Sequence, residues 1–310
     1  MLRQVLDVLD LIDTGTIDGQ KIADLFSKYP NVIASTERVN GDAGYTDFVK
    51  IMIKGKTGKS NNGGSPTLSI IGRLGGIGAR PKYKGMVSDA DGCVAALSVG
   101  LKLAQMQTYL DELEGDVVIT THICPNAPTE PHVPVDFMGS PVDMEQMNKC
   151  EVISDADAVL TIDTTKGNNI ITNKGFAISP TVKEGYILKV SQDLVNVMQQ
   201  TSGLKANVFP LCQLDITPYS NNMYHINSIL QPATSTNAPV VGVAITTETA
   251  VAGCATSASH EIDIAEAARF CLEVAKQFTS GRITFFDGAE FDQLVDLYGK
   301  MNIFQTNPKN

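Results

Sequence analysis

The chain contains no tryptophan, and aromatic residues make up only 6% of its 310 positions. Basic residues are also scarce: 24 Lys and Arg stand against 34 Asp and Glu, which gives a formal net charge of −10. Proteins that bind nucleic acids need a basic footprint, and those that bind single strands add aromatic stacking platforms. The composition therefore argues against nucleic acid as a partner.

Long apolar runs and paired cysteines are missing as well. No apolar segment approaches the roughly 18 residues of a membrane span, and the six cysteines include no CxxC pair. The first segment carries acids such as Asp7 inside its apolar pattern, which is typical of an amphipathic helix and not of a signal peptide. Scattered cysteines in a chain of this size favour free thiols in a reducing compartment. We therefore expect a cytoplasmic protein with no membrane partner.

Hydrophobic residues make up 43% of the chain, enough to build a sizeable core. From residue 67 onward, short apolar runs alternate with helical patterns, as in parallel sheets buried on both faces. The predicted strands are 32–39, 45–53, 68–72, 116–121, 158–162, 207–211 and 239–245, with one or two more within 176–190. The predicted helices lie within 1–29 and at 91–110, 142–150, 192–200, 261–278 and 289–301. This alternation predicts an α/β three-layer sandwich with a mixed, largely parallel central sheet. We expect one domain, 1–310, in which residues 1–65 are a possible N-terminal appendage.

Two carboxylates, Asp89 and Asp91, stand where a loop turns into an apolar, Ala-rich helix. One Asp at this place is explained by capping, because its side chain accepts from free backbone N–H groups and suits the helix dipole. Two of them beside Gly92, which lets a backbone or a ligand come close, also suit a metal or reaction site. Both interpretations, the helix start and the site, stay open on this motif alone.

Polar side chains gather after the predicted buried strands, where ligands bind in open α/β sheets. They include Arg73, His122 and Asp163, and His260 precedes the 261–278 helix. Imidazole and carboxylate groups together suit Zn, Mn, Fe, Co or Ni. Each residue also has a plainer interpretation: His122 can satisfy a loop backbone group, and Asp163 can cap a turn with its own side chain.

Three further residues near these strand ends are candidates for contact with a substrate or its water. Cys124 and His132 follow the same strand as His122, although His132, close to Pro131 and Pro134, also suits a structural role. Glu261 opens the helix after His260 and is a candidate general base.

The order of these residues resembles the co-catalytic zinc exopeptidase superfamily, the aminopeptidases and aminoacylases, over about residues 72–278. In that pattern a bridging metal Asp opens a helix in an Asp-x-x-Gly setting, which corresponds here to Asp89. A later Asp ends a strand, as Asp163 does, and a His precedes the C-terminal helix, near His260. The resemblance implies the phosphorylase/hydrolase-like α/β fold, zinc as cofactor and a homo-oligomer. As a whole the sequence resembles a bacterial family of unknown function that is distantly related to these peptidases.

Two departures from the superfamily pattern bear on its chemistry. The first superfamily ligand is a His, and Arg73 stands at that position; the strand that ends in Glu-Glu in the superfamily ends here in Thr121-His122. A standard two-zinc site therefore does not carry over.

Our first hypothesis is a one-metal hydrolase of a small amide, peptide or acylated amino acid. Its metal ligands would be Asp89, His122, Asp163 and His260. A bound metal would support hydrolysis because it lowers the pKa of its water and polarises a carbonyl. Asp91 or Glu261 would be the general base, and Arg73 would clamp a substrate carboxylate or replace the charge of a lost second metal.

Two other hypotheses stay open. The second is a catalytically inactive relative that binds a small anionic ligand. The third is nucleophilic catalysis by Cys124 beside His122, which requires two side chains at i and i+2 to meet.

Overall fold

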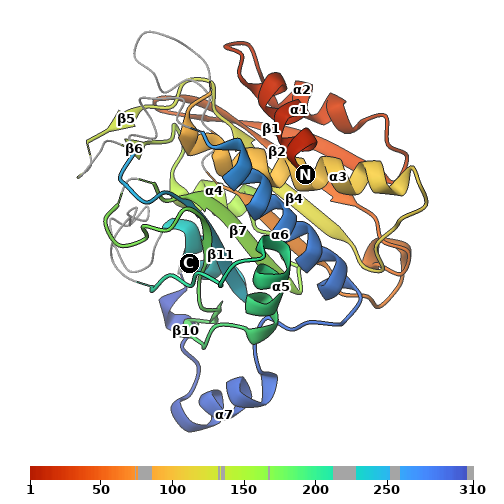
Figure 1. Ribbon diagram of the computed structural model, residues 1–310, viewed down its shortest axis with the longest axis vertical. Helices are drawn as coiled ribbons and strands as arrows, with labels where there is room; N and C mark the ends of the chain where they lie inside the picture. The colour runs from red at the N-terminus through yellow and green to blue at the C-terminus, as the bar shows by residue number, and fades with distance from the viewer. Residues whose placement is uncertain are drawn as a thin grey trace.

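In the computed structural model of the chain, the structure describes residues 1–73, 75, 86–131, 133, 137–166, 168–211, 228–251 and 259–305. A nine-stranded sheet runs through the molecule in the order β1-β2-β4-β3-β7-β11-β9-β10, with β8 paired to β11 (Figure 1). Helices cover both faces of this sheet. The predicted α/β three-layer sandwich is confirmed.

The centre of the sheet is parallel and both margins are antiparallel. The central strands are β4 (Val117–Ile123), β3 (Leu68–Gly72), β7 (Ala158–Thr164) and β11 (Val240–Thr246). On one side β2 (Gly44–Ile53) and β1 (Val32–Gly41) extend the sheet antiparallel, and on the other β8 (Gly175–Ile178), β9 (Val182–Lys183) and β10 (Tyr186–Ile187) do so. Every residue of the four central strands is buried, as their apolar sequences predict.

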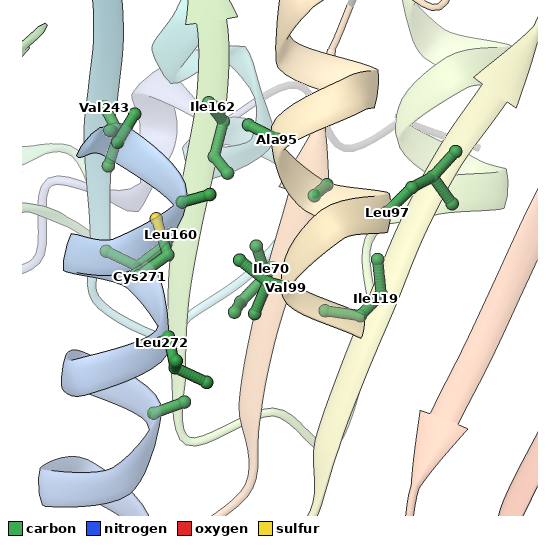
Figure 2. Close-up of a cluster of buried hydrophobic side chains, with 14 of the residues drawn as sticks. Ile70, Ala95, Leu97, Val99, Ile119, Leu160, Ile162, Val243, Cys271 and Leu272 are labelled. Atoms are coloured by element: carbon green, nitrogen blue, oxygen red, sulfur yellow. The ribbon is translucent and has the colours of Figure 1, made fainter. Parts of the chain in front are cut away.

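The larger helical layer is built on α3 (Asp91–Gln107) and α6 (Glu261–Thr279), which pack against each other and against the sheet. Around them lie α1 (Leu2–Ile12), α2 (Gly19–Phe26) and α5 (Gln192–Ser202). Figure 2 shows apolar side chains of the strands facing those of the two helices, among them Ile70, Ile119, Leu160, Val99 and Leu272. Alternate strand residues point into this core because side chains along a strand alternate between faces.

The opposite face of the sheet is covered by α4 (Met144–Glu151) and the 3-10 helix η3 (Ser228–Thr234). A second hydrophobic cluster forms there from the other alternate residues, such as Ile71, Val159 and Val240, with Ile229 and Leu230 of η3. Because of this alternation, a polar residue one position beyond β3 must face α4. That position is Arg73.

Residues 1–65 join the same sheet and the same core as the rest of the chain. β2 pairs with the whole of β4 through its residues from Asp47 to Ile53, and Val5 and Ile22 lie in the main hydrophobic cluster. The other short elements are β5 (Thr129–Glu130), β6 (Phe137–Met138) and the 3-10 helices η1 (Lys59–Asn61), η2 (Ser88–Ala90) and η4 (Asn302–Phe304).

Four predicted elements need correction. The helix predicted at 91–110 ends at Gln107, and the one or two strands predicted within 176–190 are three, β8, β9 and β10. The segment 207–211 is not a strand: it makes one bridge, between Val208 and Ile178, and Pro210 then removes a donor that a ladder would need. The last helix, α7 (Gly288–Tyr298), stops three residues before the predicted end at residue 301. Gly299 ends it with a φ of 80°, a conformation that glycine adopts without strain.

Candidate functional site

Three of the predicted site residues stand side by side at the carboxyl edge of the parallel strands. Gly72 of β3 is in register with Thr121 of β4 and Ile162 of β7. The next position on each chain is therefore His122, Arg73 and Asp163, with Arg73 in the middle. All three are buried and, by the alternation along the strands, face the layer that holds α4.

Arg73 is held by groups of α4 and not by solvent. Its Nη1 donates to Glu151 Oε2 at 2.5 Å, and its Nη2 donates to Asn148 Oδ1 at 2.9 Å. The second oxygen of Glu151, Oε1, lies 2.6 Å from Nδ1 of His122. We call Arg73, Glu151 and His122 the arginine cluster. The guanidinium of Arg73 is engaged within the chain, and the clamp on a substrate carboxylate stays a prediction.

The charge of Glu151 is stabilised although the side chain is completely buried. Burial by itself raises the pKa of this carboxyl, but the positive charges and hydrogen bonds of His122 and Arg73 outweigh it and hold the pKa below its usual range. The backbone of Glu151 is fixed as well, since Thr120 Oγ1 donates to its carbonyl at 2.9 Å. The arginine cluster therefore ties the end of α4 to β3 and β4.

A second buried ion pair lies at the start of α3, on the other face of the sheet. Lys166, just after β7, donates through Nζ to Asp91 Oδ2, and Ser259 Oγ donates to Asp91 Oδ1 at 2.6 Å. We call Asp91, Lys166 and Ser259 the lysine cluster. Burial raises the pKa of Asp91, and the opposing effects of Lys166 and Ser259 do not cancel that rise. Asp91 is the first residue of α3, as predicted, but its side chain contacts these two groups and does not cap the helix.

Gly92 allows the start of α3 to lie directly against two strand ends. A Cβ at this position would come within 2.6 Å of the Ile162 carbonyl oxygen and 2.7 Å of the Arg73 carbonyl oxygen. Any side chain here would push α3 away from β3 and β7. The glycine beside the two carboxylates thus serves a close backbone approach, one of the two reasons expected for it.

The other predicted ligands are placed differently. Asp89, in η2, accepts from the backbone N–H of Met138 at 3.1 Å, and Asp163 Oδ1 accepts from the N–H of Thr164 at 2.7 Å. The bond of Asp163 is the local interaction that the plainer interpretation of this residue expects. His260 is exposed at the N-terminus of α6 without capping it, and Glu261 beside it is exposed too.

The donor set does not fit the predicted zinc ion. Across the part of the chain that the structure describes, which includes Asp89, His122, Asp163 and His260, no three His, Cys, Asp or Glu side chains are grouped to hold a metal. Both oxygens of Glu151 are taken by Arg73 and His122, and both oxygens of Asp91 by Lys166 and Ser259. The four-ligand site expected from the sequence is therefore not assembled by these residues.

Cys124 and His132 were expected to contact a substrate. Cys124 is buried, its thiol lies 3.8 Å from the Tyr45 carbonyl oxygen, and burial raises its pKa. A thiol with a raised pKa holds little of the nucleophilic thiolate, which argues against catalysis by Cys124. His132 lies outside the described residues.

Sequence reasoning missed three residues that complete the clusters, Glu151, Lys166 and Ser259. Lys166 follows β7 by two residues, so its position at a strand end was a usable signal. Glu151 had no such signal, because a charged residue at the end of a short polar helix is typical of a solvated surface. Only the packing of α4 on the sheet brings its carboxylate between Arg73 and His122.

Within the described ranges, every helix is too short or too polar to cross a bilayer. Homo-oligomer formation, cytoplasmic location and a single domain stay predictions.

The fold is shared with solved structures. The chain superposes on a structure titled "Bottromycin maturation enzyme BotP" with a TM-score of 0.55 and 12% identity, covering 90% of this chain and 70% of that one. It is similar also to a cytosol aminopeptidase from Coxiella burnetii, with a TM-score of 0.51 and 14% identity, over 89% of this chain and 68% of that one. At these identities the likeness shows the fold alone. The predicted distant resemblance to the zinc exopeptidases is thereby confirmed at the level of the fold.

Sequence comparison gives the family. No curated protein matches the chain. A family model described as "Protein of unknown function (DUF1177)" matches residues 37–308, and the chain therefore belongs to this family.

Proposed function

We propose that the chain hydrolyses a small amide or peptide bond, and that the lysine cluster supplies the acid–base group. The observation that carries this proposal is the fully buried Asp91, which stands with its raised pKa at the carboxyl edge of the sheet, between an ammonium and a hydroxyl. Carboxyls with raised pKa values at such edges are typical of groups that exchange protons during catalysis.

Ser259 gives this buried carboxyl a route to a substrate. The side chain of Ser259 is half-buried, whereas Asp91 and Lys166 are buried. A water that attacks the amide carbonyl would pass a proton to the Ser259 hydroxyl, which passes its own proton to Asp91. The proton would return by the same route to the leaving amine as the C–N bond breaks. Lys166 holds Asp91 in place and stabilises its charged form. Asp91 is favoured over Glu261 as the base because Glu261 is exposed to solvent.

A second candidate is a non-hydrolytic protein that binds a small anionic ligand, and it is favoured by the absence of a metal-ligating side chain at position 73. At the strand edge where the superfamily pattern has a metal ligand, Arg73 is engaged in a buried ion pair. A relative that has lost metal chemistry would keep the fold without turnover.

One experiment separates the two candidates. The full chain is incubated with aminoacyl amides, dipeptides and N-acyl amino acids, release of free amine is measured, and binding is followed by thermal shift. Hydrolysis predicts turnover by the wild type and a decrease in kcat of about 10²-fold or more in Asp91→Asn, since general base catalysis contributes about that much. Asp292→Asn, on the exposed side of α7, is the matched control and should behave as wild type. Turnover equal in Asp91→Asn and wild type, or none with any substrate, would refute the proposal; thermal shifts without turnover would favour the second candidate.

A further inference from the structure

The two buried carboxylates at the carboxyl edge are each neutralised by a cation of the chain itself. Glu151 and Asp91 have no exposed surface, and their partners Arg73 and Lys166 are each 2% exposed. Buried charges are expensive to keep unless they are paired and hydrogen-bonded, and here both oxygens of each carboxylate have partners. Each of the two carboxylates, one on either face of the sheet, is therefore paired with a cation and has a hydrogen bond at both oxygens.

Arg73 also occupies the centre of the edge. Arg73 follows Gly72, which is in register with Thr121 and Ile162, so it stands between His122 and Asp163. It donates a hydrogen bond to Glu151 of α4. An imidazole and carboxylates around a central position are groups that suit a divalent cation. In this chain the central position belongs to a guanidinium, which carries a permanent positive charge and binds carboxylates in a fixed geometry.

A metal ion and these cations are alternatives. To bind Glu151 or Asp91, an ion would have to displace a partner from a carboxylate oxygen, either the cation itself or, at the other oxygen, His122 or Ser259. In each case the ion would lie beside the buried Arg73 or Lys166. Two positive charges a few ångströms apart repel strongly where water is excluded. No grouping of three metal donors among the described residues compensates for this repulsion.

We propose that Arg73 and Lys166 are built-in cations that take the place of metal ions at Glu151 and Asp91, so that the chain folds and maintains this edge with no metal at either carboxylate. The proposal does not depend on hydrolysis, because it concerns the folded protein without substrate.

The test compares the full chain after dialysis against a chelator with the same protein supplied with zinc chloride, and measures metal content and Tm. We expect the wild type to carry well below one ion per chain and to melt at the same temperature in both. A fall of several degrees in the chelator that is absent in Glu151→Gln or Asp91→Asn would overturn the proposal, as would a bound ion that either variant removes. An ion that both variants keep lies elsewhere and agrees with the proposal.

Variants at Arg73 sharpen the test. Arg73→Met removes the cation, and we expect its Tm to fall by about 10 °C, the shift that loss of a buried ion-pair partner produces in a chain of this size. Zinc should then restore part of the loss, because Glu151 and His122 are left without the guanidinium. Arg73→Lys keeps the positive charge, so its Tm should not change when zinc is added. An equal rise in Tm with zinc in the wild type would contradict the proposal. If Arg73→Met does not fold, the wild-type comparison decides alone.

Discussion

The arginine cluster and the lysine cluster are built on the same plan but differ in the state of their carboxyl groups. In each, one buried carboxylate lies between a cation and a second polar group, close to the end of a central strand. The pKa of Glu151 is nevertheless lowered, whereas the pKa of Asp91 is raised. Burial raises the pKa of both carboxyls, so the groups around them account for the opposite directions of the two shifts.

Glu151 has two nitrogen partners that can carry positive charge, and Asp91 has one ammonium and a neutral hydroxyl. At Glu151 the interactions with His122 and Arg73 outweigh desolvation, whereas at Asp91 those with Lys166, Ser259 and His260 do not. The arginine cluster is consequently a fixed charge pair that joins α4 to the sheet. The lysine cluster keeps a carboxyl that can take up a proton, which is what an acid–base group requires.

The largest effect is expected from Arg73→Met. It leaves Glu151 charged and buried with His122 alone, and loss of a buried ion-pair partner costs about 3–5 kcal/mol. Unfolding in urea measures the change in free energy. The matched control is Lys59→Met, whose partner Asp157 lies in an ion pair with both side chains 39% exposed, and exposed pairs contribute about 1 kcal/mol or less. An equal loss in the two variants would show that the arginine cluster does not stabilise the fold.

Lys166→Met should cost less, about 2–3 kcal/mol at neutral pH, because Asp91 can neutralise itself by binding a proton. Without Lys166 the pKa of Asp91 rises further above its usual 3.8, since Lys166 lowers it. The folded state then binds a proton that the unfolded state releases, so stability falls as pH rises above the unfolded value. Urea unfolding of this variant relative to wild type, at about pH 5 and about pH 8, should show the smaller loss at the lower pH. A loss independent of pH would mean that Asp91 stays charged.

Most of the fold was predictable because the signals are local. The central strands are short apolar runs between turns, and α3 and α6 follow from long helical patterns. The strand predicted at 207–211 was wrong because strand formation depends on a pairing strand. The segment has strand-like residues but forms a single β-bridge, between Val208 and Ile178. Strand propensity does not form a ladder without a partner that runs alongside.

The site was predictable only in part, for a related reason. Arg73, His122 and Asp163 were found because strand ends of a parallel sheet share one edge. Their pairing was not, because Glu151 arrives from a helix about 30 residues after His122 and its position depends on how α4 packs. In each cluster the second carboxylate oxygen is bound by a residue far away in the sequence, His122 for Glu151 and Ser259 for Asp91. Spacing along a sequence carries no information about such contacts.

A smaller effect is expected from acid on the arginine cluster, because protonation of Glu151 removes the charge that its partners stabilise. The folded pKa of Glu151 lies below its ordinary value of 4.5, so the unfolded chain takes up a proton first as pH falls. The stability that Glu151 contributes is thus fully present above pH 4.5 and is lost as pH falls through the folded value. Free energies of unfolding from about pH 6 down to about pH 3 should fall less steeply in Glu151→Gln than in wild type. Parallel slopes would contradict the lowered pKa.

The smallest effect is expected from Ser259→Ala, which removes one hydrogen bond to Asp91 and should cost about 1 kcal/mol. The hydrogen bond favours the charged carboxylate, so its loss raises the pKa of Asp91 further above the usual range. A ¹³C NMR titration of the Asp91 carboxyl reports this shift directly. Ser280→Ala is the control: this hydroxyl donates to the Lys276 carbonyl at the other end of α6, and its removal should leave the pKa of Asp91 unchanged. A pKa that does not move in Ser259→Ala would mean that Ser259 does not share a proton with Asp91, and the route from the buried carboxyl to a substrate would have to be sought elsewhere.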